Sequence, residues 1–322
     1  MRYLDTTTAT GRKISKIGVG TWQFGSKEWG YGDEYATGQA REIVHRALDL
    51  GVTLFDTAEM YGFGKSERIL GEALGDRREE AYVASKIFPV WPTGSVTQQR
   101  GVASADRLGV RTMDLYQVHQ PNPVVRDSST MPGMASLQRT GLVGDVGVSN
   151  YSLERWKKAD EALGAPVLSN QVQYSLVRRG PEDDLIPFAQ QNDRVVIAYS
   201  PLAQGLLSGK FDAQNRPRNG VRRYNPLYTL ENLERARPLL RVLRDVADAH
   251  GAASSQVALA WVVSHPNVVA IPGASSVEQL EKNVAAAELD LSPDEIAALD
   301  DASALYDPVG GLRVAKDIVT GH

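Results

Sequence analysis

Eight short apolar segments alternate with segments of helical periodicity between residues 17 and 304 of this 322-residue chain. Short apolar runs without clear polar alternation are typical of parallel strands that are covered on both faces. Strict alternation of strand and helix indicates an α/β fold, and eight repeats of it predict a closed (β/α)8 TIM barrel. An open, doubly wound sheet is the alternative that the same pattern allows.

Glycine and capping residues mark many of the boundaries between these elements. We predict strands over 17–21, 53–56, 81–86, 114–119, 143–148, 167–173, 195–199 and 268–271. We predict helices over 34–50, 66–74, 96–108, 132–140, 153–163, 183–191, 233–249, 255–264, 277–287 and 293–304. Before the first strand, 2–4 and 13–15 are expected to pair as an N-terminal β-hairpin, and 307–322 form a C-terminal tail after the extra helices.

No linker or break in composition divides the chain, so we expect a single domain over 1–322. Residues 201–230 lack periodicity and are rich in Gly, Pro, Arg and Asn, which predicts a long loop inserted on the barrel. Loops of this length in a compact domain are usually functional or mobile. Its Arg218, Arg222 and Arg223 either attract an anionic substrate or cofactor phosphate, or form a solvated face.

Composition argues against several classes of function. The chain has no cysteine, which rules out disulfides and thiol catalysis, and its five histidines show no HxH or HExxH spacing, so we expect no metal site. A net charge of −4 argues against nucleic acid as a partner. The chain has no apolar run of about 18 residues and no secretory signal, so we expect a cytoplasmic protein without a membrane partner. The oligomeric state stays open.

Four side chains with acid–base chemistry follow strand-like segments in the first third of the chain: Asp56, Tyr61, Lys86 and His119. The carboxyl ends of barrel strands share one face, so these residues are expected to meet at its mouth. A neighbouring ammonium lowers the pKa of a tyrosine, and a carboxylate holds the ammonium in place. An imidazole beside them donates a hydrogen bond to a substrate oxygen. The four residues therefore predict a site that protonates a carbonyl oxygen while hydride arrives from elsewhere.

The motifs around these residues resemble those of the aldo-keto reductase superfamily. The resemblance is carried by FDTAEMYG, VASK, DLYQVH, VGVSNYS, NQVQYSLV and IAYSPLAQGLLSGK, and it extends from residue 17 to about residue 290. It is closest to the bacterial branch that also resembles potassium-channel β subunits. The family implies a barrel that binds a nicotinamide cofactor without a Rossmann fold. It also implies that Tyr61 is the general acid, that Lys86 paired with Asp56 lowers its pKa, and that His119 orients the carbonyl.

The resemblance also implies which residues hold the cofactor. Ser149, Asn150 and Gln171 match positions that bind the nicotinamide carboxamide, whose donors and acceptors they complement. Tyr199 matches the aromatic residue that stacks on the nicotinamide ring. A loop that covers the pyrophosphate is expected to follow, although Lys210 in it is equally well explained as a solvated surface residue. The full expected set is Gly20, Thr21, Trp22, Ser149, Asn150, Gln171, Tyr199, Ser200, Leu202, Gly205, Lys210, Gly273, Ser275, Ser276, Gln279 and Asn283.

The adenosine end departs from the family pattern. Members that prefer NADP carry Lys or Arg just after the Pro-Gly of the last strand, where this chain has Ser275 and Ser276. Hydroxyl and N–H groups at a helix start still suit a 2′-phosphate, without the forked contact of a guanidinium. We therefore expect NADP(H), with NAD(H) as the alternative. Residues 18–23 lack the third glycine of a dinucleotide fingerprint, so they are assigned no phosphate role.

We predict an NAD(P)H-dependent oxidoreductase that reduces aldehydes and ketones to alcohols. Two alternatives stay open: a cofactor-binding redox sensor or regulatory subunit with slow turnover, and an alcohol or sugar dehydrogenase working in the oxidative direction. The small-molecule substrate is not identified by the sequence. Segment 121–142, next to His119, is rich in Pro, Ser and Met, which predicts unusual substrate geometry or a disordered loop. Aromatic residues in the loops after strands one and three either wall an apolar pocket or cap the mouth; they are Trp22, Phe24, Trp29, Tyr31, Phe88 and Trp91.

Overall fold

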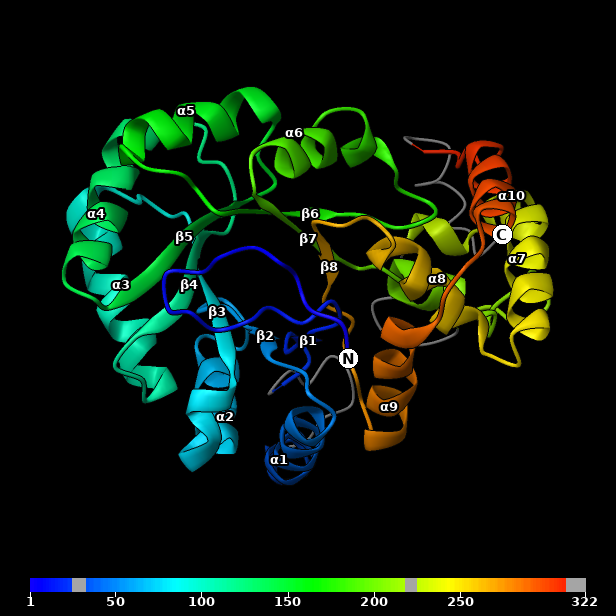
Figure 1. Ribbon diagram of the computed structural model, residues 1–322, viewed down its shortest axis with the longest axis horizontal. Coiled ribbons are helices and arrows are strands. Elements are labelled where there is room, and N and C mark those ends of the chain that lie inside the picture. Colours follow the sequence, from blue (N-terminus) through cyan, green and yellow to red (C-terminus); the bar gives the residue numbers. More distant parts are fainter. Residues whose placement is uncertain (25–32, 218–224, 311–322) are drawn as a thin grey trace.

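Eight parallel strands, hydrogen-bonded in the order of the sequence, form one sheet in the computed structural model, which describes residues 1–24, 33–217 and 225–310. Parallel bridges from Ile17 to Ala270 and from Gly20 to Gly273 join the first strand to the last. The predicted (β/α)8 barrel is therefore confirmed, and Figure 1 shows its strands turning around a common centre. The strands are β1 Val19–Gly20, β2 Leu54–Asp56, β3 Tyr82–Ile87, β4 Met113–Val118, β5 Val143–Ser149, β6 Ser169–Gln173, β7 Val195–Tyr199 and β8 Val268–Ala270.

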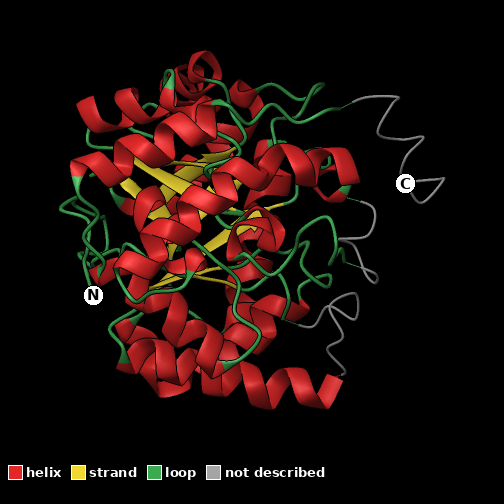
Figure 2. Cartoon of the chain, turned by 90° about the vertical axis from the view of Figure 1, so that its right-hand side faces the viewer, coloured by secondary structure: helices red, strands yellow, loops and turns green. Residues whose placement is uncertain are grey.

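Helices enclose the strands on the outside, as Figure 2 shows. Each of the first six strands is followed by a helix, and further helices lie around β8. The α-helices are α1 Asp33–Asp49, α2 Lys65–Leu74, α3 Gly94–Leu108, α4 Asp127–Arg139, α5 Leu153–Leu163, α6 Leu185–Gln191, α7 Leu230–Ala249, α8 Ser254–Val263, α9 Val277–Ala285 and α10 Pro293–Ala304. Short 3-10 helices are η2 Gly75–Glu80, η3 Gly180–Glu182, η4 Ala203–Ser208, η6 Pro226–Tyr228 and η7 Ala286–Glu288.

Side chains along each strand alternate between two hydrophobic regions. The larger region lies between the strands and the helices and includes Tyr116 and Trp156. A smaller cluster fills the inside of the barrel and includes Leu115 and Ile197. Leu115 and Tyr116 are neighbours in β4, so the alternation places His119, four residues after Leu115, on the inner side.

The N-terminal segment forms the predicted hairpin, but its two arms are joined by an isolated bridge and not by full strands. Tyr3 and Ser15 make an isolated antiparallel bridge, and the Leu4 N–H donates to the Ile14 carbonyl at 2.9 Å. The segment continues across the amino-terminal ends of the strands, where the Ala9 N–H donates to the Asp145 carboxylate at 3.1 Å. This hairpin therefore closes the floor of the barrel, opposite the mouth.

The helix predicted over 132–140 is confirmed as α4, but it begins earlier, at Asp127, and the alternative of a disordered loop over 121–142 is wrong. Pro132 lies inside this helix and does not start it. The first turn is held by tertiary contacts: the Asp127 carboxylate accepts from the Tyr151 hydroxyl at 2.7 Å and from Arg155 Nε at 2.8 Å. Sequence periodicity does not register contacts of this kind, which explains the error.

Several other boundaries shift by a few residues. Helix α7 begins at Leu230, three residues before the predicted start, because the Thr229 side chain caps it by accepting from the Asn232 N–H. The predicted loop 201–230 contains the 3-10 helices η4 and η6. Some expectations lie outside the described residues; these are Trp29, Tyr31, Arg218, Arg222, Arg223 and the tail after residue 310.

Candidate active site

The structure brings Asp56, Tyr61 and Lys86 together at the mouth of the barrel. Asp56 is the last residue of β2, and Lys86 is the last but one of β3. Lys86 Nζ lies 2.6 Å from Asp56 Oδ1 and 3.1 Å from the Tyr61 hydroxyl oxygen. A third bond runs from Lys86 Nζ to the Thr57 carbonyl at 2.9 Å, so the ammonium uses all three of its hydrogens.

The ammonium of Lys86 stays charged although its side chain is fully buried. Burial works against the charge, but the Asp56 carboxylate and the Tyr61 oxygen outweigh it, so the pKa of Lys86 is raised above its ordinary value. The second oxygen of Asp56 accepts from Gln171 Nε2 at 2.8 Å. Hydrogen bonds to other residues therefore hold both Asp56 and Lys86 in position.

The pKa of Tyr61 reflects two opposing effects. Burial raises it above its ordinary value, and Lys86 lowers it without compensating in full. The predicted lowering by Lys86 is therefore present, but burial outweighs it. Tyr61 is consequently protonated at neutral pH, which is the form that a general acid requires.

His119 lies against Tyr61, with the two rings edge to face and their centroids 5.7 Å apart. Burial, helped by the charge of Lys86, lowers the pKa of His119 to about 3. The imidazole is therefore neutral at physiological pH. Its Nδ1 is buried and has no hydrogen-bond partner among the described residues.

The residues expected to bind the carboxamide form a continuous chain of hydrogen bonds at the ends of β5, β6 and β7. The Tyr199 hydroxyl donates to Asn150 Oδ1 at 3.0 Å, and Asn150 Nδ2 donates to Ser149 Oγ at 3.0 Å. Ser149 Oγ in turn donates to the Gln171 carbonyl at 2.8 Å. Through the bond from Gln171 to Asp56, this chain connects to the ion pair of Asp56 and Lys86.

Two residues just after these strands have left-handed backbones. Asn150 follows β5 with φ 60°, and Ser200 follows β7 with φ 49°. A residue with a side chain rarely adopts this conformation, and such strain concentrates at functional sites. The loop beyond Ser200 continues with φ 57° at Gln204 and φ 105° at Gly205, and Tyr228 supports it by donating to the Gln204 carbonyl.

The expected adenosine end lies at the start of α9. Ser276 caps the helix by accepting from the Gln279 N–H at 3.1 Å, and Gln279 Oε1 accepts from the N–H and the hydroxyl of Ser275. Asn283 Nδ2 donates to the Gly273 carbonyl at 3.3 Å. Lys210 and Ser275 are exposed, and Leu202 is half-buried. A ligand that contacts all of these residues therefore has to extend from the η4 loop to the start of α9.

Gly20 at the end of β1 and the two residues after it are placed differently from one another. Gly20 has no room for a side chain, since a Cβ there would lie 2.8 Å from the Ile271 carbonyl oxygen. Thr21 is fully buried, and its hydroxyl bonds to the Asp56 carbonyl and to Ser66. Trp22 is 42% exposed. Thr21 thus stabilises the end of β2 through its hydrogen bond to Asp56. Of the three residues, Trp22 is the one whose side chain reaches the surface.

The aromatic residues expected near the mouth also differ in how exposed their side chains are. Phe24 is 4% exposed and belongs to the core between strands and helices, so its assignment to the substrate pocket is wrong. Trp91 is 63% exposed, and Phe88 is half-buried. Trp22, Phe88 and Trp91 remain as candidates for the substrate side of the mouth.

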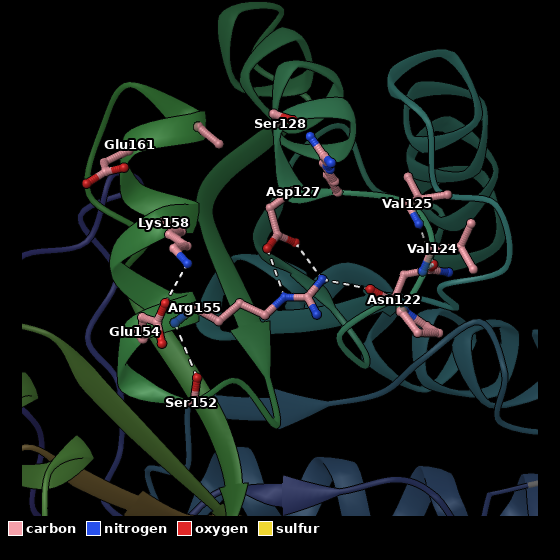
Figure 3. A pocket seen from close by; sticks show the side chains of 13 residues that line it. Asn122, Val124, Val125, Asp127, Ser128, Ser152, Glu154, Arg155, Lys158 and Glu161 are labelled. Atoms are coloured by element: carbon pink, nitrogen blue, oxygen red, sulfur yellow. Dashed lines mark hydrogen bonds and ion pairs between the residues drawn. The ribbon is translucent and has the colours of Figure 1, made fainter.

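A separate pocket of about 650 Å³ lies beside the mouth between the start of α4 and α5 (Figure 3). Its charged side chains pair with each other, as in Arg155 with Asp127 and Lys158 with Glu154. None of the four acid–base residues lines it. We therefore assign it no role in the chemistry.

Sequence reasoning missed Glu59, which lies within the motif FDTAEMYG. Its carboxylate accepts from the Phe88 N–H at 2.7 Å and from Arg100 at 3.0 Å. It also missed the buried hydroxyls of Thr57 and Ser66, which bond to each other at 3.0 Å behind Asp56. Two features of the sequence could have identified Glu59. It lies two residues before Tyr61, and no oppositely charged residue stands close to it in the sequence.

Two features are absent from the described residues. These residues contain no cluster of three or more His, Asp or Glu side chains arranged to hold a metal ion. No helix among them is sufficiently long and apolar to cross a membrane.

The chain is similar to known proteins over nearly its whole length. A relative from Mycobacterium tuberculosis, named an uncharacterized oxidoreductase, is 60% identical over 99% of this chain and 98% of its own. A methylglyoxal reductase of Escherichia coli is 36% identical over 90% of this chain and 91% of its own. The solved structure of an aldo-keto reductase from Klebsiella pneumoniae in complex with NADPH has a TM-score of 0.75 at 29% identity, and the match covers 97% of this chain and 98% of that one.

The model of the aldo/keto reductase family matches residues 16–304, which include all eight strands and all four acid–base residues. On the strength of this match and of these relatives, the chain belongs to the aldo/keto reductase family.

Proposed function

We propose that this protein reduces aldehydes and ketones to alcohols with NADPH, and that Tyr61 is the general acid. The observation that carries the proposal is the contact between the Tyr61 hydroxyl and the buried Lys86 ammonium at 3.1 Å. A protonated phenol beside a fixed positive charge donates its proton to a developing alkoxide, because the charge stabilises the phenolate that remains.

The other acid–base residues assist Tyr61. Asp56 holds Lys86 in place by an ion pair of 2.6 Å and keeps it charged. His119 is neutral, so it orients the carbonyl oxygen by a hydrogen bond and does not compete as an acid. Its ring packs edge to face against Tyr61, which keeps the two side chains next to each other. The substrate oxygen is therefore met by one proton donor and one hydrogen-bond donor.

The residues at the ends of β5 to β7 fit a nicotinamide cofactor. Ser149, Asn150 and Gln171 present hydroxyl and amide groups, which match the donors and acceptors of a carboxamide. Tyr199 stands beside Asn150 and offers an aromatic face for the ring. When bound, the cofactor supplies the hydride. The complex of the Klebsiella pneumoniae relative with NADPH supports NADP(H) as the cofactor, and the hydroxyls of Ser275 and Ser276 leave NADH as the alternative.

Two further assignments complete the proposal. The whole chain acts as one barrel domain, and the loop of residues 201–230 covers the pyrophosphate of the cofactor. The naming of one relative as a methylglyoxal reductase supports small reactive carbonyl compounds as the first substrates to test. The finer likeness to potassium-channel β subunits stays a prediction.

The test is Tyr61→Phe, assayed with NADPH and a panel of aldehydes that includes methylglyoxal. We expect kcat to fall by at least about 100-fold, the usual range for loss of a general acid. NADPH affinity, measured by quenching of protein fluorescence, should change less than about twofold, because the substitution removes one oxygen outside the carboxamide site. Undiminished turnover in Tyr61→Phe would remove Tyr61 as the acid. Tight NADPH binding without turnover by the unmodified protein would favour the sensor instead.

A further inference from the structure

The loop that carries Tyr61 has no regular secondary structure. Between the end of β2 at Asp56 and the start of α2 at Lys65, the chain forms a series of turns. Its backbone is held by i→i+3 bonds such as Tyr61 N–H to the Ala58 carbonyl at 3.1 Å. Such turns fix local shape but do not fix the distance from Tyr61 to a residue on another strand. Some other contact must therefore hold the phenol beside Lys86.

Glu59 supplies contacts of this kind. Its backbone N–H donates to the carbonyl of Lys86 at 3.3 Å. Its Oε1 accepts from the N–H of Phe88, two residues after Lys86, at 2.7 Å. Glu59 is itself two residues before Tyr61, and both of these bonds reach the backbone at Lys86 or just after it. The Tyr61 loop and the Lys86 strand are thereby joined at the level of the catalytic pair.

Arg100 completes the clamp from helix α3. Its Nη1 donates to Glu59 Oε1 at 3.0 Å and to the Phe88 carbonyl at 2.5 Å. The Glu59 side chain is 12% exposed, which limits screening by water. Burial raises the pKa of Glu59, against the effects of the Phe88 N–H and the two nearby guanidinium groups. The carboxylate therefore depends on these partners for its charge.

A second carboxylate anchors the other end of the same loop. Glu67, in α2, is fully buried and accepts from the Ser85 hydroxyl and from Arg107 Nε at 2.5 Å. Arg107 also approaches Glu59 Oε2 at 3.9 Å and packs against Gly64. Glu67 thus secures α2 against β3. Of the two carboxylates, Glu59 is the one closer to Tyr61 along the chain.

We infer that Glu59 is a positioning residue for the reduction: its carboxylate, clamped to the Phe88 N–H and Arg100, sets the distance between the Tyr61 hydroxyl and Lys86. The inference rests on the proposed function, in which Tyr61 is the proton donor. Displacement of a catalytic group by about 1 Å costs on the order of 100-fold in rate, so a partly loosened clamp should cost about tenfold.

Asp160 offers a matched control at the opposite end of the barrel. Its carboxylate also accepts one backbone N–H, from Val167 at 2.6 Å, and pairs with a guanidinium, Arg194, at 3.6 Å. Its side chain is 23% exposed, and burial raises its pKa as it does for Glu59. Asp160 lies in α5 beside the segment leading into β6, away from the mouth. Its loss should therefore lower stability without changing the chemistry.

The experiment compares Glu59→Ala, Glu59→Gln and Asp160→Ala in the full chain, with and without Tyr61→Phe. For each variant, Tm, NADPH affinity and kcat are measured. We expect Glu59→Ala to lower kcat about tenfold with NADPH affinity changed less than twofold. Glu59→Gln keeps an acceptor for the Phe88 N–H and should recover most of the loss. In the Tyr61→Phe background, Glu59→Ala should have no further effect, because both substitutions act through the same group.

The outcomes separate the two proposals. A loss of kcat in Asp160→Ala equal to that in Glu59→Ala, or a full tenfold loss on top of Tyr61→Phe, would overturn the positioning role of Glu59. Unchanged activity in Tyr61→Phe alone would instead sink the proposed function. If Glu59→Ala does not fold, the same comparison is made with Glu59→Gln and Asp160→Asn, for which a smaller loss of kcat confined to Glu59→Gln is expected.

Discussion

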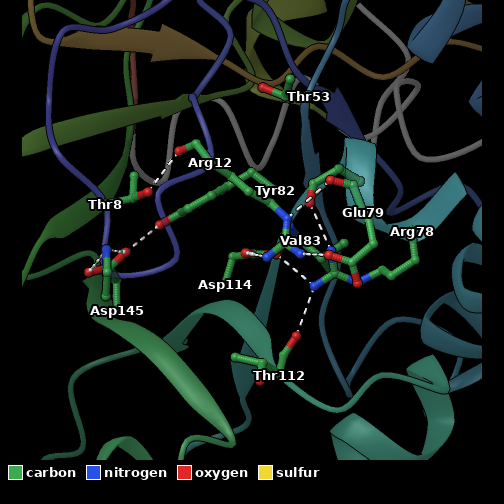
Figure 4. Close-up of polar contacts among 12 residues, drawn as sticks. Thr8, Arg12, Thr53, Arg78, Glu79, Tyr82, Val83, Thr112, Asp114 and Asp145 are labelled. Atoms are coloured by element: carbon green, nitrogen blue, oxygen red, sulfur yellow. Dashed lines mark hydrogen bonds and ion pairs between the residues drawn. The ribbon is translucent and has the colours of Figure 1, made fainter.

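Both ends of the barrel contain buried carboxylates that pair with Lys or Arg side chains. The two ends differ in whether the polar groups around each pair have all their hydrogen-bond partners. At the floor, Asp114 is fully buried and accepts from Arg12 at 2.8 Å, from Arg78 at 2.7 Å and from the Val83 N–H at 2.9 Å (Figure 4). Nearby, the Tyr82 hydroxyl donates to Asp145 at 3.1 Å. Both carboxylates thus have their partners within the protein.

At the mouth, polar groups beside the ion pair lack some hydrogen-bond partners within the described residues. Asp56 and Lys86 satisfy each other, but within the described residues the Tyr61 hydroxyl only accepts a hydrogen bond, and His119 Nδ1 has no partner. A buried polar atom without a partner costs stability and calls for an explanation, and at the mouth a bound ligand is the one that fits the proposed function. The comparison teaches that buried charge serves stability when its partners are complete and reactivity when one partner is left to the substrate.

The largest effect on stability is expected from Asp114→Ala. This substitution removes the carboxylate shared by two partly buried guanidinium groups and leaves the Val83 N–H without its acceptor, which costs about 3–5 kcal/mol of unfolding free energy. Denaturant unfolding measures the loss, and kcat of the folded fraction should be unchanged. Asp114→Asn, which keeps one acceptor oxygen, is the control. A fall in kcat without a fall in stability would contradict the division between floor and mouth.

Lys86→Met makes the opposite test at the mouth. Loss of the ammonium removes the charge that stabilises the Tyr61 phenolate, so the barrier should rise by at least about 2–3 kcal/mol, or roughly 100-fold in kcat. Stopped-flow measurement of a single turnover isolates this step from product release. Stability should also fall, because Asp56 is left buried with Gln171 as a partner. Full activity in Lys86→Met would show that the ion pair is structural, like those of the floor.

The smallest effect concerns the pH dependence of stability. His119 has a pKa of about 3 in the folded protein and an ordinary value of 6.5. Between these values the unfolded chain binds a proton that the folded protein does not, so the free energy of unfolding falls as the pH falls through this window. His119→Gln should therefore lose about 2 kcal/mol less than the unmodified protein between neutral pH and about pH 5. Equal losses, measured by denaturant unfolding at each pH, would mean that His119 is less buried than the structure indicates.

Much of the fold was predictable because its signals are local. Helices α3 and α5 end as predicted at Gly109 and Gly164, whose left-handed backbones give φ 64° and φ 73°. The error at α4 arose where Asp127 bonds to Tyr151 and Arg155, residues far along the chain. Segments whose limits depend on such distant contacts are not readable from periodicity.

The candidate site divides in the same way. Asp56, Lys86 and His119 follow strand ends in the sequence, and parallel strands necessarily bring such ends to one face, so their meeting was predictable. The direction of the Tyr61 pKa was not, since burial outweighs Lys86 only once the phenol is enclosed. The role of Glu59 also depended on the folded structure, because its partners Phe88 and Arg100 come from another strand and another helix.

The sequence by itself determined the eightfold alternation, the side of the barrel on which the polar groups gather, and the family. Spacing along the chain encodes these properties directly. Only the tertiary structure decided how deeply Tyr61 and His119 are buried, that Thr21 and Phe24 point away from the ligand side, and which carboxylates are fully paired. Desolvation and pairing are properties of enclosed space, and that space is created only when segments distant in sequence pack together.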